Sequence, residues 1–207
     1  MNGFFITFEG PDACGKSTQI NLLKNYFQDK GYDVVVTREP GGTLISEKIR
    51  ALILDKENKN MSYKTEALLY AASRAQHIDE LIKPSLLQGK IVICDRFIDS
   101  SLIYQGIGRN LGIDKIYNLN LFAIEDTLPD ITIIFQIEEE EIQRRKNRRK
   151  NLDRLECEKD EFHKKVYEGY KILKDIYPER IKNVDANGTV KQVHERIIKL
   201  IQNAMEK

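Results

Sequence analysis

The sequence predicts an α/β protein, a three-layer sandwich in which helices flank a five-stranded parallel sheet. Short, nearly unbroken runs of β-branched and aromatic residues recur along the chain, as in strands that are buried on both faces of a parallel sheet. Segments with helical periodicity lie between these runs, and this alternation implies right-handed crossovers. A glycine-rich phosphate-binding pattern follows the first run, where such a fold would place it.

The predicted strands are the apolar runs Phe4–Phe8, Val34–Thr37, Ile91–Cys94, Ile131–Gln136 and, more weakly, Ile181–Val184. The predicted helices are Ser17–Lys30, Thr43–Leu54, Lys64–Gln88, Glu161–Ile176 and Val190–Met205. The sequence contains no internal repeat and no Pro/Gly/Ser-rich linker. Residues 1–207 are therefore predicted to form a single domain.

Composition narrows the class of protein. The chain has 207 residues, of which 41% are hydrophobic and 31% charged, as in a soluble globular domain. Lys+Arg number 33 and Asp+Glu 32, so no overall field favours nucleic acid or an anionic membrane as a partner. The apolar stretches are too short to span a bilayer, and no signal peptide is visible.

The cysteines indicate the compartment. Cys14, Cys94 and Cys157 are far apart, odd in number and lack C-x-x-C spacing. This pattern argues against a disulfide framework or a zinc site and for a reducing environment. We expect a cytoplasmic protein.

Residues 9–18 (EGPDACGKST) carry the strongest chemical signal, because Gly10, Gly15, Lys16 and Ser17 match G-x-x-x-x-G-K-[ST] between a strand and a helix. Backbone N–H groups of such a loop form an anion site at a helix N-terminus. Lys16 would reach the β- and γ-phosphates, and Ser17 would offer its hydroxyl to Mg²⁺. The alternative is a strand–helix turn without a ligand. The predicted ATP-binding residues are Gly10, Pro11, Asp12, Ala13, Cys14, Gly15, Lys16, Ser17 and Thr18.

Asp95 and Arg96 close a predicted buried strand and so lie at the carboxyl edge of the sheet, where open α/β sheets bind ligands. Asp95 would order Mg²⁺ with its water shell, and Arg96 would bridge phosphates. The alternative is an ion pair at a strand end. Beside a phosphate loop we favour the functional interpretation.

A dense basic run, QRRKNRRKNLDR, occupies residues 143–154. It could be a solvated helix face in which Glu140 pairs with Arg144 and Glu141 with Arg145 at i,i+4 spacing. Nucleic-acid binding is less favoured, because aromatic residues are not interleaved with the basic ones. We predict a lid at about residues 143–156 that brings cations over ATP.

Five motifs together resemble one family. FEGPDACGKSTQ, TREPGGT, LLYAASRAQH, DRFIDSSLIYQG and LDRLE occur in this order and look like the bacterial form of thymidylate kinase. The resemblance runs from about Phe4 to the final helix. It implies a P-loop NTPase fold, transfer of the γ-phosphate of Mg²⁺-bound ATP to dTMP, and a homodimer packed through helices.

For the acceptor phosphate, the resemblance implies Arg38, Arg50 and Arg96 as ligands. Glu39 would border the metal together with Ser17 and Asp95, and the tight turn at this segment would accommodate a cis bond before Pro40.

For the nucleoside, the resemblance implies that Tyr70 stacks on thymine while Arg74 and Gln105 hydrogen-bond the pyrimidine edge. Tyr70 and Arg74 are four residues apart on a predicted helix and so share a face. Taken singly, Tyr70 could simply pack in the core and Gln105 could stabilise a loop. The other implied contacts are Ser101 in the turn before Tyr104, Asp12 facing the deoxyribose 3′-hydroxyl, and Tyr104 near the 2′ position.

The catalytic residues implied are Lys16, Arg96 and a lid arginine, because the loop has Ala13 and Cys14 where some family members carry an arginine. Arg148 or Arg149 would be the transition-state cation, with Arg144 and Arg145 as alternatives. The histidines His77, His163 and His194 are expected on helix surfaces or at the edge of the core, without a catalytic role. The segment Asp185–Gly188 is a candidate for contact with adenine.

Besides the nucleic-acid-binding module that the basic run could form, two rival functions remain open. One is a kinase for another nucleotide or small molecule, which the acceptor motifs disfavour. The other is a GTPase switch, which requires N-K-x-D, and the sequence does not contain this motif.

Overall fold

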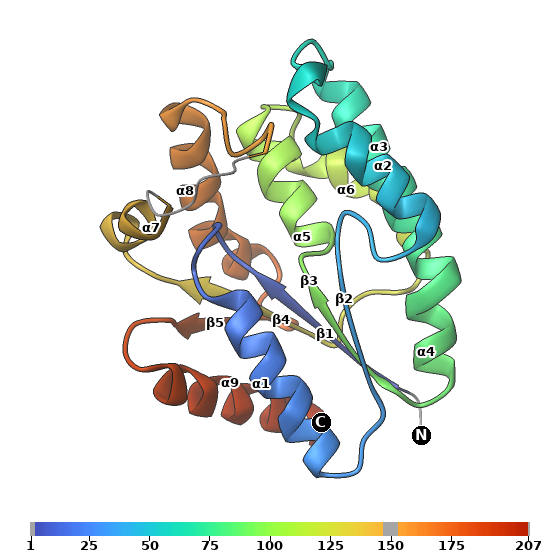
Figure 1. Cartoon of the computed structure of the whole chain (residues 1–207), viewed down its shortest axis with the longest axis vertical. Helices are drawn as coiled ribbons and strands as arrows, with labels where there is room; N and C mark the ends of the chain where they lie inside the picture. Colours follow the sequence, from blue (N-terminus) through green and yellow to red (C-terminus); the bar gives the residue numbers. More distant parts are fainter. Residues whose placement is uncertain (1–2, 147–152, 207) are drawn as a thin grey trace.

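The computed structural model of the chain describes residues 3–146 and 153–206 and contains a five-stranded parallel sheet (Figure 1). The strands are β1 (Phe4–Glu9), β2 (Val34–Arg38), β3 (Ile91–Asp95), β4 (Ile131–Gln136) and β5 (Ile181–Asp185). Their order across the sheet is β2-β3-β1-β4-β5. The predicted fold class is confirmed, and the observed strands end at or one residue beyond the predicted ones.

The helices lie between and after the strands. They are α1 (Lys16–Asp29), α2 (Leu44–Leu54), α3 (Tyr63–His77), α4 (Lys83–Leu87), α5 (Ile98–Ser101), α6 (Ile113–Ile124), α7 (Glu139–Lys146), α8 (Asp160–Ile176) and α9 (Val190–Met205). A 3₁₀ turn (Lys56–Asn58) follows α2, and wider π-helical turns, Ile78–Ile82 and Leu102–Gly108, join α3 to α4 and extend α5.

The helix predictions hold with two differences. The segment Lys64–Gln88, predicted as one helix, is interrupted by the π-helical turn at Ile78–Ile82, which sequence periodicity does not reveal. The helices α5, α6 and α7 were not predicted as elements. α5 has only four residues and is continued by a π-helical turn, so its apolar spacing departs from the 3.6-residue period.

Both faces of the sheet are covered, because successive side chains of a strand point to opposite sides. Ile6 and Phe8 of β1 pack in one core with residues of α1 and α9, which lie together on one side of the sheet in Figure 1. Phe5 points to the other face, where the centroid of its ring lies 5.0 Å from that of the Phe97 ring. Residues of α2, α3, α5, α6 and α8 complete that second core.

The topology brings three loops to one edge of the sheet. β3 pairs with both β1 and β2, so that Asp95 lies opposite Phe8 on one side and Arg38 on the other. The carboxyl ends of these parallel strands meet at the same edge. The residues that follow β1, β2 and β3 therefore lie close together, although they are far apart in the sequence.

Within the described ranges, no helix combines the length and apolar character needed to cross a bilayer. Cys14, Cys94 and Cys157 are all free thiols, the first two of them buried.

Candidate active site

The carboxyl edge of the sheet opens into a cavity of about 540 Å³, a size typical of small-molecule sites. It extends from the loop after β1 to the side chains of Tyr70 and Gln105. The predicted site residues that line it are Asp12, Ala13, Cys14, Gly15, Lys16, Ser17, Thr18, Arg38, Glu39, Arg50, Tyr70, Arg74, Asp95, Arg96, Tyr104 and Gln105. The structure thus brings the residues predicted for ATP and those predicted for dTMP into one cavity.

The remaining predicted residues lie elsewhere. Gly10 and Ser101 are outside the lining of this cavity, and Pro11 lines a neighbouring one. Arg148 and Arg149 are outside the described residues, so their predicted catalytic role remains a prediction.

The phosphate loop owes its shape to its backbone. Gly10 and Gly15 adopt φ of 137° and 105°, and a Cβ at Gly10 would approach Cys14 Sγ and Phe135 Cβ to 3.2 Å. Gly15 caps α1, which begins at Lys16, so the loop amides converge at a helix N-terminus that favours anions. Lys16 Nζ donates to the carbonyl oxygens of Gly10 and Pro11 at 3.1 and 3.2 Å.

The residues present fit a magnesium ion. Asp95 Oδ1 is buried, lies 3.9 Å from Lys16 Nζ, and has no hydrogen-bond partner in the part of the chain that is described. Ser17 supplies a hydroxyl to the same cavity. No cluster of three or more His, Cys, Asp or Glu side chains suited to a metal occurs among the described residues. A single carboxylate and a hydroxyl suit Mg²⁺, which usually keeps several waters and binds substrate phosphates.

Arg96 lies between the loop after β1 and the acceptor end of the cavity. Its guanidinium donates to Asp12 at 2.8 Å, Ser100 Oγ at 3.1 Å and the Tyr170 hydroxyl at 3.0 Å. It also lies over the Tyr104 ring at 5.1 Å. The backbone at Arg96 has φ of 69°, a left-handed conformation that is strained for a residue other than glycine. Contacts from several elements thus fix the position of this guanidinium beside the phosphate loop.

Glu9 supports Arg96 from inside the core. Its carboxylate accepts from the backbone N–H groups of Phe97 and Ser100 at 2.7 and 3.1 Å and from the hydroxyls of Ser100 and Tyr170 at 2.6 and 3.0 Å. Burial raises the pKa of Glu9 to about 7, and the nearby charge of Asp99 adds to the increase. Glu9 therefore fixes the start of α5 and two partners of Arg96.

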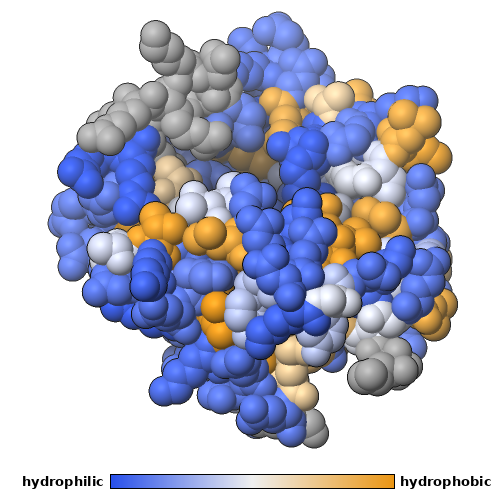
Figure 2. All heavy atoms as spheres, turned by 60° about the horizontal axis from the view of Figure 1, so that its bottom comes forward, coloured by the Kyte–Doolittle hydropathy of each residue, from blue (hydrophilic) through white to orange (hydrophobic). Residues whose placement is uncertain are grey.

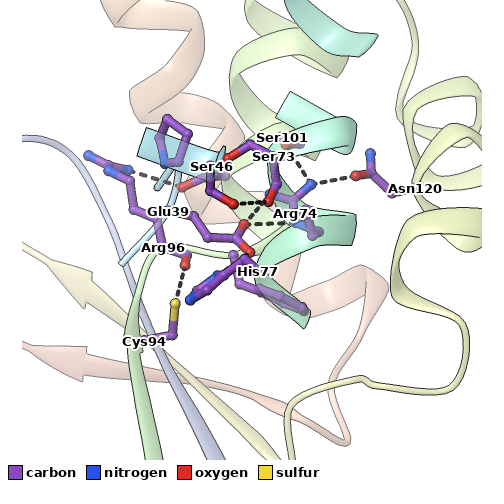
Figure 3. Close-up of polar contacts among 12 residues, drawn as sticks. Glu39, Ser46, Ser73, Arg74, His77, Cys94, Arg96, Ser101 and Asn120 are labelled. Atoms are coloured by element: carbon purple, nitrogen blue, oxygen red, sulfur yellow. Dashed lines mark hydrogen bonds and ion pairs between the residues drawn. The ribbon is translucent and has the colours of Figure 1, made fainter. Parts of the chain in front are cut away.

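A buried ion pair between Arg74 and Glu39 lines the part of the cavity predicted to bind the acceptor; Figure 3 shows its contacts. Arg74 is 1% exposed, and its guanidinium contacts Glu39 Oε2 through Nε at 2.8 Å and through a terminal nitrogen at 2.7 Å. It also donates to Ser101 Oγ at 3.1 Å and to Asn120 Oδ1. The bond between Glu39 and Pro40 is cis, as the family turn suggested. The metal role predicted for Glu39 stays a prediction, since its carboxylate already carries these contacts.

His77 corrects an expectation. It was expected on a helix surface or at the edge of the core, but it is fully buried, with Nδ1 3.1 Å from Glu39 Oε1 and Nε2 2.7 Å from Thr37 Oγ1. A tautomer with the proton on Nδ1 satisfies both contacts, because the carboxylate accepts and the hydroxyl donates. His77 is missed by sequence reasoning because no pattern shows that β2 lies beside α3.

The residues predicted to recognise the base come from three helical segments. Tyr70 and Arg74 of α3 both line the cavity, as their spacing predicts. Gln105 lies on the π-helical turn after α5, not in a loop, and Ser101 ends α5, not in a turn. Ser101 acts on Arg74, from which its hydroxyl accepts a hydrogen bond. Burial raises the pKa of Tyr70 well above its usual range, so its phenol stays neutral.

Two arginines flank Pro40 at the acceptor end. Arg38 donates to the Pro40 carbonyl at 3.2 Å and pairs with Glu47 at 2.7 Å, while Arg50 donates to the same carbonyl at 2.8 Å. Burial, followed by the like charge of Arg38, lowers the pKa of Arg50. Two cations that repel each other in this way would be stabilised by a bound anion.

The helix α7 brings the predicted lid to the phosphate loop. Arg145 donates to Ala13 O at 3.3 Å and pairs with Glu141 at 2.6 Å. Arg144 also pairs with Glu141, at 2.7 Å, instead of with Glu140 as its spacing predicted. Both arginines thus share one carboxylate.

A second cavity, of about 450 Å³, lies beside Pro11 and the ends of β4 and β5. Asp185 and Asn187, from the segment proposed for adenine, are part of its wall.

Several residues around the site escaped sequence reasoning. Glu9 was within a motif that was noted, and its position after an apolar strand was the one available signal. Glu66, Asn120 and Tyr170 carry no local signal, because each reaches its partner from a distant segment. Arg154 belongs to the noted basic run and to LDRLE, but its buried contact with Glu66 was not predicted.

Comparisons with known proteins agree with this geometry. A sequence model of the thymidylate kinase family matches residues 8–197. The thymidylate kinase of Bacillus velezensis is 48% identical over 209 aligned residues, covering 100% of this chain and 99% of that protein. That of Finegoldia magna is 50% identical, with 96% and 97% covered. A crystal structure of the thymidylate kinase from Ehrlichia chaffeensis superimposes with a TM-score of 0.80 at 36% identity, covering 98% and 100% of the two chains.

Proposed function

Because this chain belongs to the thymidylate kinase family, we infer that it transfers the γ-phosphate of ATP to dTMP, giving dTDP and ADP, with Mg²⁺ bound to the donor. The observation that carries the assignment is the single cavity that contains both the phosphate loop and the base-recognition residues Tyr70, Arg74 and Gln105.

The acceptor is already an oxyanion near neutral pH, so the reaction requires no general base. Rate enhancement would come from alignment of the two phosphates and stabilisation of the migrating charge. Lys16, once released from the carbonyls of Gly10 and Pro11, would reach the β- and γ-phosphates; its place in the phosphate loop supports this role. Arg96 would bridge the donor and the acceptor, and Arg148 or Arg149 would add a further cation.

The metal site would consist of Asp95 and Ser17, with Glu39 at its border. When bound, Mg²⁺ would neutralise charge on the β- and γ-phosphates and fix their geometry. Asp95 Oδ1, which is buried at the wall of the cavity and has no hydrogen-bond partner among the described residues, supports this assignment.

The acceptor site would hold dTMP by both of its ends. Arg38, Arg50 and Arg96 would bind the phosphate, and Tyr70 would stack on the thymine ring. Arg74 and Gln105 would read the edge of the base, with Ser101 supporting Arg74. Asp12 would face the 3′-hydroxyl, and Tyr104 would crowd the 2′ position.

Homodimerisation through helices fits the distribution of exposed apolar side chains. Phe122 is 91% exposed on α6, and Leu68 of α3 and Leu44, Ile45 and Leu52 of α2 are also exposed. The helices α2 and α3 pack together, as do α3 and α6. Figure 2 shows hydrophobic areas along the side where α2, α3 and α4 lie in Figure 1. Exposed apolar surface of this kind marks interaction sites.

The free thiols fit a cytoplasmic location.

A panel of acceptors tests the function. Release of ADP from ATP is measured with dTMP, dUMP, dGMP, CMP and thymidine, with and without Mg²⁺. We expect dTMP to give the highest kcat/KM, activity to disappear when Mg²⁺ is chelated, and Lys16→Ala to lose turnover with every acceptor. Faster turnover of dGMP, CMP or the nucleoside would overturn the assignment.

A further inference from the structure

Glu66 is a buried carboxylate outside the groups assigned so far. It lies on α3 with no exposed surface. Oε1 accepts from Gln105 Nε2 at 3.0 Å and Arg109 Nε at 3.1 Å, and Oε2 accepts from Arg109 at 3.0 Å and Arg154 at 2.7 Å. One carboxylate thus binds a base-recognition residue together with two guanidinium groups.

The two arginines are themselves held firmly. The Arg109 guanidinium lies between the rings of Tyr63 and Phe162, at 4.6 and 4.5 Å, and pairs with Glu158 at 2.7 Å. Stacking on two rings restricts a planar guanidinium strongly.

Arg154 is anchored to the end of α2. Its Nε donates to Ile53 O at 2.7 Å, and its backbone N–H donates to Leu54 O at 3.1 Å. Both carboxylate oxygens of Glu66 therefore contact donors that are themselves held in place, so the carboxylate has little freedom to rotate.

Glu66 also remains ionised. Burial by itself would raise its pKa, but the hydrogen bonds from Arg109, Gln105 and Arg154 outweigh burial, so that the pKa lies below its usual value. An ionised carboxylate accepts hydrogen bonds and donates none. The Gln105 amide must therefore turn its NH₂ group towards Glu66.

This constraint decides what Gln105 offers to a ligand. With Nε2 bound to Glu66, the amide oxygen is directed away from Glu66, and Gln105 lines the acceptor end of the cavity. An amide oxygen pairs with an N–H group. Thymine and uracil carry a hydrogen on N3, whereas cytosine presents a bare N3 acceptor, which would face the oxygen without a proton between them.

We propose that Glu66 is a positioning residue for acceptor specificity: it fixes the orientation of the Gln105 amide so that the site selects a pyrimidine with a hydrogen on N3. The inference rests on the proposed function, because it requires dTMP to bind against Gln105.

The test compares kcat and KM for dTMP and dCMP in Glu66→Asp, with Mg²⁺-ATP saturating. Aspartate keeps the charge between Arg109 and Arg154 but withdraws the carboxylate from Gln105 by one methylene. We expect the ratio of kcat/KM for dTMP over dCMP to fall by about tenfold or more, chiefly through a higher KM for dTMP. The KM for ATP should change by no more than about twofold. An unchanged ratio in folded Glu66→Asp would overturn the inference.

The matched control is Glu158→Gln. It removes the other carboxylate on Arg109, which is partly exposed and contacts Arg109 but, within the described residues, not Gln105. The ratio should therefore stay unchanged. A comparable fall in this control would also overturn the inference, because general loosening of Arg109 would then explain both variants.

If Glu66→Asp does not fold, hydrogen exchange of the Gln105 side-chain amide in the unaltered protein decides. We expect the Gln105 NH₂ hydrogens to exchange slowly both without dTMP and with dTMP bound. Exchange at the rate of a free amide would contradict the proposal. Failure of the unaltered protein to phosphorylate dTMP would refute the proposed function. Activity with dTMP combined with an unchanged ratio would refute only the role of Glu66.

Discussion

At the donor end of the cavity, the phosphate-binding groups come from consecutive residues of one loop, and the backbone of Gly10, Ala13 and Gly15 sets their direction. At the acceptor end the predicted ligand-binding side chains come from separate segments, and a buried ion pair holds Arg74 and Glu39 in place. The donor end therefore depends on local conformation, which tolerates many side-chain changes. The acceptor end depends on buried charges, and removal of one leaves its partner unpaired.

This comparison separates the kinetic effects of mutation. Changes at the donor end should lower kcat, because they remove charge stabilisation of the migrating group. Changes at the acceptor end should raise the KM for dTMP and lower stability together.

The largest effect is expected from the double variant Arg148→Ala, Arg149→Ala. Loss of a transition-state arginine should lower kcat by about 10³-fold, with a smaller change in either KM. Pre-steady-state measurement of ADP formation checks this. Unchanged turnover would place the catalytic cation elsewhere, with Arg144 or Arg145 next to be tested.

Arg74→Ala should affect the acceptor end and the fold together. The KM for dTMP should rise far more than that for ATP, and the free energy of unfolding should fall by about 3–5 kcal/mol, because Glu39 loses its buried partner. Steady-state kinetics and denaturant unfolding give the two values. Arg38→Ala is the control for stability, since its pair with Glu47 is 46% and 42% exposed and should contribute no more than about 1 kcal/mol. An equal rise in the KM for dTMP and for ATP would show that Arg74 does not contribute to the acceptor pocket.

Glu9 lies next to the phosphate loop and supports Arg96, and its titration should make the free energy of unfolding depend on pH. Its pKa is raised in the folded protein, from 4.5 to about 7, so the folded state binds the proton more tightly than the unfolded state. This contribution is fully present below pH 4.5 and is lost as the pH rises to about 7, by up to about 3 kcal/mol. Unfolding measured across this range should show the decline in the unaltered protein and a weaker one in Glu9→Gln.

Glu47→Gln is the comparison for that experiment. The hydrogen bond from Arg38 lowers the pKa of Glu47, so its contribution has the opposite sign and is lost as the pH falls. If the free energy of unfolding changes with pH equally in the unaltered protein and in Glu9→Gln, Glu9 is not the group that titrates.

The smallest effect is expected from Cys14→Ala. Cys14 is buried within the phosphate loop, and the proposed phosphate ligands are the loop amides, not its thiol. We expect kcat and both KM values within about twofold of the unaltered protein, and a stability loss of about 1 kcal/mol for the lost packing. Steady-state kinetics of the variant measure this. A large fall in kcat would mean that side chains shape the donor loop as well. The donor end would then not differ from the acceptor end in its dependence on side chains.

The sequence alone determined the sheet, because continuous apolar runs at Phe4–Phe8 and Ile91–Cys94 can be buried only between two layers of helices. It also determined the phosphate loop, whose residues are contiguous. Asp95 and Arg96 were placed correctly, since the end of a buried strand lies at the ligand-binding edge.

Tertiary structure alone decided which partners hold the acceptor residues. His77, Glu66 and Asn120 contact the site across 38 or more residues of sequence. Their partners depend on how α3 packs against the end of β2, the π-helical turn after α5, and α6. Local periodicity contains no information about such pairing. The position of a charged residue in a helical pattern does not show whether its side chain is buried against a distant segment or exposed to solvent. The physical reason is that a hydrogen bond between distant segments exists only once the chain has brought them together.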